Sequence, residues 1–142
     1  MAIPNNRANQ KPIENHGELE VYQLGFDAAM RIFNLSKLFP PQERYSLTDQ
    51  IRKSSRSVCS NIAEGWGRRR YEAAFVNKFN EAFSEARETL SWIQFAVKCE
   101  YLSRSEGADL HQTYDRIIGK RVTMETNPHP WLLPIKRQKN NG

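Results

Sequence analysis

Residues 70–99 read RYEAAFVNKFNEAFSEARETLSWIQFAVKC, and their apolar side chains recur at the period of an α-helix. The recurring row is Phe75, Phe79, Ala82, Ala86, Leu90, Ile93 and Val97. Its mean step of about 3.7 residues is close to the straight-helix value and far from the alternation of a strand. Trp92, Phe95 and Cys99 lie on the other side of the same helix. The stretch therefore predicts a long helix that is apolar on two sides.

The segment 18–39 has the same property. Its main row advances by three or four residues and comprises Val21, Leu24, Ala28, Ile32, Leu35 and Phe39. A second row lies beside it and comprises Tyr22, Phe26, Ala29 and Phe33. Pro40 and Pro41 end the predicted helix, because proline has no backbone N–H and restricts the residue before it.

A helix over 46–65 is predicted between these two. Ser46 has the chemistry of an N-cap, and Asp49 stands at the capping-box position. The buried stripe is narrow, with the small residues Ser54 and Ser55 interrupting Leu47, Ile51, Val58 and Ile62. Gly65 fits the C′ position, since glycine adopts the left-handed conformation without a steric penalty.

The last predicted helix covers 103–124. Ser103 and Glu106 form a second capping box at its start. One face carries Leu110, Tyr114, Ile117 and Arg121, flanked by Ile118 and Val122. Because no segment alternates like a strand, the four helices predict an all-α, antiparallel up-down four-helix bundle over residues 18–124. Residues 1–17 are expected to form a disordered arm, and residues 125–142 an extended, flexible tail rich in proline and basic residues.

Composition limits the class of protein. Of 142 residues, 39% are apolar and 26% charged, the balance of a soluble globular protein. No run of eighteen apolar residues is present, so no membrane span is expected. The first residues lack the apolar core of a secretory signal, which makes the cytoplasm the expected compartment.

The second apolar sides predict self-association. The residues expected at an interface between identical subunits are Tyr22, Phe26, Phe33, Trp92 and Phe95. Leaving such side chains exposed forfeits roughly 1.5–3 kcal/mol each compared with burying them. The alternative is that all these rings face a single core, in which case a monomer suffices.

No constellation of catalytic or metal-binding residues is visible. Three histidines and two cysteines lack the spacings of zinc sites, so no metal and no cofactor are expected. His111 is interpreted as a partly buried, hydrogen-bonded imidazole, and Cys59 as a packing residue. The sequence thus predicts a protein that is not an enzyme.

Positive charge is concentrated in one stretch. The formal net charge is +5, and residues 52–70 alone hold six basic residues against the single acid Glu64. The six are Arg52, Lys53, Arg56, Arg68, Arg69 and Arg70, and a smaller basic group follows at 136–139. Such a stretch favours phosphate-rich partners, although a solvated basic face is an equally good explanation. Trp66 and Tyr71 could stack on unpaired bases or pack within the protein.

The stretch ERYSLTDQIRKSSRSVCSNIAEG at 43–65, preceded by Phe39-Pro40, resembles a known family. It is similar to the small bundle proteins encoded by intervening sequences in 23S ribosomal RNA genes, with a likeness over about residues 19–124. These resemble in turn the accessory protein of diversity-generating retroelements. The resemblance implies a ring-shaped homopentamer with a positively charged surface suited to nucleic acid. It also implies that Asn61, Glu64 and Gly65 form a structural motif at the corner after the second helix. Cys59 departs from the proline that is frequent in the family.

We therefore expect an oligomeric helical bundle that binds the backbone of RNA or DNA. The alternative is a scaffold that captures a protein partner through its outward aromatic residues and the tail segment at 131–133.

Overall fold

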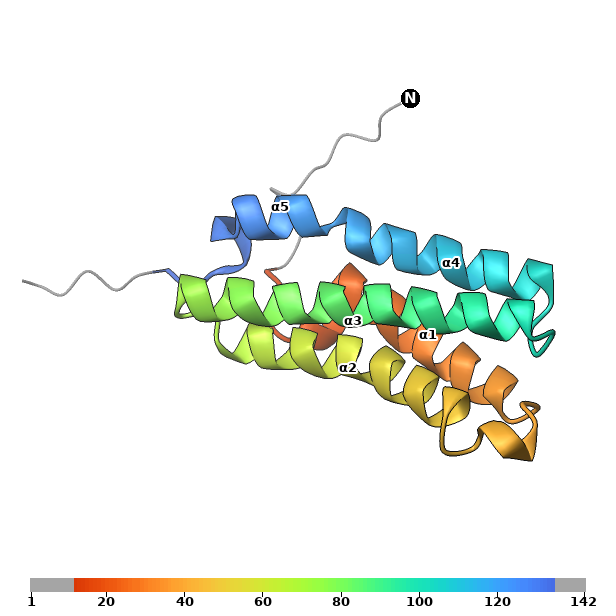
Figure 1. The fold of residues 1–142 in the computed structure, drawn as a ribbon. Helices are drawn as coiled ribbons and strands as arrows, with labels where there is room; N and C mark the ends of the chain where they lie inside the picture. The colour runs from red at the N-terminus through yellow and green to blue at the C-terminus, as the bar shows by residue number, and fades with distance from the viewer. Residues whose placement is uncertain (1–11, 135–142) are drawn as a thin grey trace, which may run out of the picture.

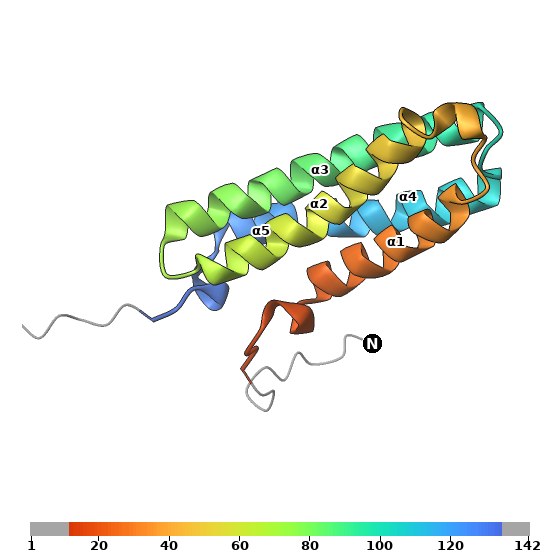
Figure 2. The same cartoon turned by 90° about the horizontal axis from the view of Figure 1, so that it is seen from below.

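Four long helices form the frame of the computed structural model, which describes residues 12–134. They are α1 (Glu20–Ser36), α2 (Leu47–Gly67), α3 (Glu72–Lys98) and α4 (Arg104–Gly119). The shorter elements are the 3-10 turns η2 (His16–Glu18), η3 (Pro41–Glu43) and η4 (His129–Trp131), and the helix α5 (Arg121–Thr126). Successive long helices run in opposite directions side by side (Figures 1 and 2), and α4 also packs against α1. The all-α up-down bundle is confirmed, since every regular element of the described range is helical.

Most of the core is built from the rows that the periodicity predicted. Phe75 and Phe79 of α3 are fully buried, and their rings stack with centroids 4.5 Å apart. Phe83 lies outside the predicted row but is also buried, and its ring is tilted against Phe79 with centroids 6.3 Å apart. Buried aliphatic and small residues from the other three helices surround them, among them Val21, Ala28, Ile32, Ile51, Val58, Ile62, Leu110 and Ile117. Ion pairs from Arg116 and Lys120 to Glu20, both 2.9 Å long, join the end of α4 to the start of α1.

The small residues of α2 allow α3 to pack closely. Ser54 and Ser55 are buried, and the hydroxyl oxygens of Ser54 and Thr89 lie 2.8 Å apart in the core. The Thr89 oxygen also lies 2.8 Å from the carbonyl oxygen of Glu85. A polar contact between α2 and α3 therefore crosses an otherwise apolar interface, and more residue pairs meet between these two helices than between any others.

Both predicted ends of α2 differ from the sequence expectation. The Ser46 side chain makes no capping hydrogen bond, and Asp49 instead pairs with Lys53 at 3.0 Å. The helix continues through Gly65 to Gly67, and no glycine of the described range has a positive φ angle. Gly65 is therefore not a left-handed C′ residue but a buried helical residue that faces α3. The second capping box is confirmed, with Ser103 and Glu106 bonding to each other's backbone N–H groups at 3.0 Å and 2.9 Å.

The predicted fourth helix is two helices. The chain leaves α4 at Gly119 and begins α5 at Arg121, which turns Arg121 and Val122 to solvent and buries Met124. Residues 125–134 are also not the extended, flexible tail that was expected: α5 continues to Thr126, and Trp131 and Leu132 pack against the core. The Leu133 N–H donates to the Arg69 carbonyl oxygen at 3.2 Å, which attaches this segment to the corner between α2 and α3. The remainder of the tail, 135–142, lies outside the described residues.

Only the end of the predicted arm lies within the described range, and it leads into η2. Within the arm, residues 1–11 lie outside the described range, whereas His16 packs edge-on against the Tyr22 ring at 4.8 Å. No helix in residues 12–134 combines the length and the apolar character needed to cross a membrane.

Candidate nucleic-acid interface

The first half of α2 carries three of the six predicted basic residues, and each has different surroundings. Arg52 is half-buried, and its Nε donates to the Ser36 hydroxyl at 2.8 Å. Lys53 is exposed and paired with Asp49. Arg56 is exposed and makes no ion pair with any residue of 12–134. Of these three, only Lys53 therefore has its charge compensated by another described residue.

Three cations surround the ring of Phe33. The Lys37 Nζ lies 4.7 Å from the ring centroid, and the guanidinium carbons of Arg52 and Arg56 lie 5.0 Å and 5.7 Å from it. Each contact is a cation–π interaction that holds its side chain toward the face between α1 and α2. Phe33 was predicted at a subunit interface, and the three cations beside its ring would repel an identical, equally positive copy at this face.

The other three basic residues follow α2 at the corner with α3. Arg69 stacks on Trp66, with its guanidinium carbon 3.8 Å from the ring centroid, and Trp66 itself is buried. Arg68 and Arg70 are exposed. Of the two rings considered for base stacking, Trp66 packs within the protein, whereas Tyr71 keeps 65% of its surface exposed.

The single basic stretch of the sequence forms two separate clusters in space. Arg52 lies on α2 and Arg68 is the C-cap residue of the same helix, sixteen residues further on, which places them about 24 Å apart along its axis. We call the set of Lys37, Arg52 and Arg56 the α1–α2 cluster and the set Arg68, Arg69 and Arg70 the corner cluster. Sequence reasoning missed Lys37, because its approach to α2 depends on how α1 packs.

Neither cluster is neutralised by acids. Among the residues that the structure describes, no carboxylate lies within ion-pair distance of the six cations of the two clusters, whereas Lys53, Lys78, Arg116, Lys120 and Arg121 are all paired. The acids nearest to the corner cluster in sequence are Glu64, which pairs with Lys78, and Glu72, the first residue of α3. Both clusters are therefore free to bind anions.

An apolar groove of about 310 Å³ adjoins the α1–α2 cluster. Its walls come from both helices and comprise Tyr22, Phe26, Ala29, Met30, Phe33, Arg56, Cys59, Ser60 and Ala63. The second aromatic row of the sequence is thus one wall of this groove. Burial raises the pKa of the Cys59 thiol to about 11, so the thiol is neutral and serves packing.

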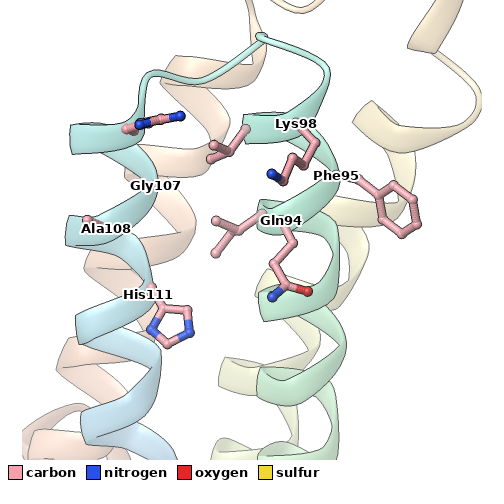
Figure 3. Close-up of a pocket in the computed structure, with 9 residues that line it drawn as sticks. Gln94, Phe95, Lys98, Gly107, Ala108 and His111 are labelled. Atoms are coloured by element: carbon pink, nitrogen blue, oxygen red, sulfur yellow. The ribbon is translucent and has the colours of Figure 1, made fainter.

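A second apolar groove of about 550 Å³ lies between α3 and α4 (Figure 3). Lys98, Gly107 and His111 are among its lining residues, and Phe95 points from α3 away from α4.

Phe95 is 55% exposed, as expected of an outward residue, whereas Trp92 is partly buried and packs against the core. His111 is exposed and lies 3.1 Å from an Asp115 oxygen, so the expected partial burial is wrong.

The described part of the chain contains no group of three or more His, Cys, Asp or Glu side chains placed so that they could hold a metal ion.

The family model of the 23S rRNA-intervening sequence protein matches residues 17–121. The chain belongs to this family. A crystal structure of a protein with unknown function from the S23 ribosomal protein family of Bacteroides thetaiotaomicron is similar to it, with a TM-score of 0.68 and 29% sequence identity. That alignment covers 75% of this chain and 99% of the other. No curated protein matches the chain.

In this chain, the three residues of the predicted corner motif make separate contacts. Glu64 pairs with Lys78 at 3.0 Å and so ties α2 to α3 near the corner. Gly65 lies where α2 meets α3. The Asn61 amide instead donates to the Ser57 carbonyl oxygen of its own helix at 2.9 Å, so Asn61 makes no bond across the corner.

Proposed function

We propose that this protein is a cytoplasmic, non-enzymatic accessory protein that binds the phosphate backbone of nucleic acid through the α1–α2 and corner clusters and acts as a homo-oligomer. The observation that carries the proposal is the set of five arginines on α2 and at the corner (Arg52, Arg56, Arg68, Arg69 and Arg70), none of which forms an ion pair with another described residue. Arginine presents a planar fork of donors that matches a phosphate, and an unpaired guanidinium contacts an anion without first breaking an internal ion pair.

The spacing of the clusters supports an extended polyanion as the partner. About 24 Å along α2 corresponds to roughly seven nucleotides of one strand in a duplex, at about 3.4 Å per nucleotide. Leu133 is attached at the corner, and from there the sequence continues into Lys136, Arg137 and Lys139. Contacts of this kind carry little sequence information, so we expect weak sequence preference.

Self-association is supported by apolar side chains left exposed on two faces. Phe26 and Met30 are 49% and 45% exposed on α1, and Phe95 is 55% exposed on α3 beside the larger groove. Exposed apolar patches of this kind typically mark protein–protein contacts. Because three cations lie beside Phe33 and would repel an identical copy, we assign the interface to the Phe95 face, and the resemblance to ring-forming relatives favours a pentamer.

The alternative is a protein-interaction scaffold that uses the outward aromatic residues and the tail. Phe95 is exposed and can contact such a partner directly. Trp131 and Leu132 pack against the core of this chain, so a partner could contact them fully only by displacing them from the core.

The proposal is tested by the salt dependence of binding to RNA and DNA. Binding through backbone phosphates releases counterions, so the logarithm of affinity falls linearly with the logarithm of salt concentration. Substituting Arg56, Arg68 and Arg70 together by Glu removes three exposed, unpaired cations and is expected to flatten that slope by up to about 2.7.

The matched control substitutes Arg31, Arg44 and Arg87 by Glu, which changes the net charge equally at exposed positions outside both clusters and outside the groove between α3 and α4, and it is expected to leave the slope nearly unchanged. Failure of the unmodified protein to bind either polymer at low salt would refute the proposal. Multi-angle light scattering tests the oligomer: Phe95→Glu is expected to lower the mass, and a 16.5 kDa particle for the unmodified protein at micromolar concentration would contradict self-association.

A further inference from the structure

The groove between α1 and α2 joins unpaired cations to exposed aromatic surface. We propose that it binds a base of single-stranded nucleic acid, with the adjacent phosphates on the α1–α2 cluster. The inference rests on the proposed function and deepens it, because it names unpaired strands as the preferred partner and α1–α2 as the site that distinguishes them from duplexes.

The cationic end of the groove favours binding of an anion. Lys37, Arg52 and Arg56 all lie within 6 Å of one ring centroid, so their like charges are close together. Within the described range no carboxylate pairs with them, and the neighbouring Asp49 is engaged by Lys53. Such an arrangement is relieved when a phosphate occupies the space between the cations.

The other end of the groove offers a stacking surface. The rings of Tyr22 and Phe26 are nearly parallel, with an interplanar angle of 23° and centroids 6.1 Å apart. Phe26 is 49% exposed, so its ring has a free surface on which a base would extend the stack. On the opposite wall Cys59, Ser60 and Ala63 are small, which leaves space beside the ring.

The length and polarity of the groove fit a short piece of one strand. Tyr22 and Phe33 are eleven residues apart on α1, which corresponds to about 16 Å. The three cations gather at the Phe33 end of the groove, whereas the exposed Phe26 ring lies away from them, stacked on Tyr22. Phosphates are therefore directed to the Phe33 end and a base to the Phe26 end. In a duplex the bases are already stacked inside the helix and cannot enter.

An acidic peptide would also satisfy the cations, but it would leave the stacking surface unused. The proposal therefore makes a claim that charge alone does not: binding requires a base as well as phosphates.

The test measures fluorescence anisotropy at low salt with labelled oligo(dT), oligo(U), a duplex of equal length, and a strand with the same number of phosphates but no bases. Phe26→Ala is expected to weaken binding of both single strands by about 5- to 150-fold, the range for loss of one stacked base, and to leave duplex affinity unchanged. The abasic strand is expected to bind the unmodified protein no more tightly than oligo(dT) binds the variant. Leu38→Ala removes a more exposed apolar side chain just beyond the end of α1 and serves as the matched control, with no expected effect.

Ser60→Leu provides a second variant that fills the groove from α2 with a non-aromatic side chain and leaves Tyr22 and Phe26 in place, and it is expected to act like Phe26→Ala. The inference is overturned if the abasic strand binds as well as oligo(dT), if both variants bind single strands normally, or if polyglutamate displaces oligo(dT) as effectively as unlabelled oligo(dT) does. In those cases salt-dependent binding by the arginines still supports the proposed function. Absence of binding to every polymer would instead refute both.

Discussion

A β-carbon on Gly65 would lie 2.6 Å from the Cδ2 atom of Phe79. The α2 helix thus approaches the aromatic core of α3 more closely than a residue with a side chain permits. The same site lies one residue from Glu64, whose ion pair with Lys78 joins these helices at the surface. Glycine at this position sets the separation of α2 and α3, and with it the position of the corner cluster.

Gly65→Ala is expected to lower the free energy of unfolding by about 1–3 kcal/mol, because the added methyl group must displace a fully buried ring. Gly67→Ala is the control on the same helix: no atom lies within 4 Å of its β-carbon position, and alanine is the better helix former. Urea denaturation of both variants tests the prediction. Equal stability of the two would show that α2 and α3 can separate freely at this point.

Thr89→Val is expected to cost about 1–3 kcal/mol of stability, because it leaves the buried Ser54 hydroxyl with only its long 3.5 Å contact to the Ile51 carbonyl oxygen. Adding Ser54→Ala removes this poorly satisfied hydroxyl and is expected to recover part of the loss. A double-mutant cycle by chemical denaturation measures the coupling directly. Additive effects of the two substitutions would mean that the hydroxyls do not interact.

Tyr114→Phe is expected to raise stability by about 1 kcal/mol. The Tyr114 side chain is fully buried, its hydroxyl has no hydrogen-bond partner among the described residues, and burial raises the pKa of the phenol. Removing the unsatisfied hydroxyl while keeping the ring eliminates a desolvation cost without leaving a large cavity. Thermal melting measures the change, and a drop in the melting temperature would indicate that the hydroxyl has a partner in solution.

The stability of the protein is expected to fall in alkaline solution, in part through Cys59. Its pKa is about 11 in the folded protein against 9.0 ordinarily, so the folded state disfavours the thiolate. The neutral Cys59 thiol contributes fully to the free energy of unfolding below about pH 9, and this contribution is lost as the pH rises toward 11. Denaturation at several pH values should show a steeper loss for the unmodified protein than for Cys59→Ala. Parallel pH profiles would contradict the assignment.

The location of the helices and of most core residues follows from the sequence, because the period of apolar residues is a local property of a helix. The row from Phe75 to Ile93 is buried at Phe75, Phe79, Ala82, Ala86 and Ile93, and Ser103 caps α4 through a bond only three residues away. The family likewise follows from the residues at 43–65, which depend on no long-range contact. The basic residues of the candidate interface could be listed from the sequence for the same reason.

The arrangement of the cation clusters and the position of the tail segment were decided only by the packing of one helix on another. Lys37 and Arg56 meet over Phe33 because α1 and α2 lie side by side, and the single basic stretch divides because α2 continues unbroken through Gly65. Trp131 packs on the bundle because the break after Gly119 redirects the chain toward the corner. Helical period fixes which residues share a face, but contacts between distant segments determine what that face meets and where a helix ends.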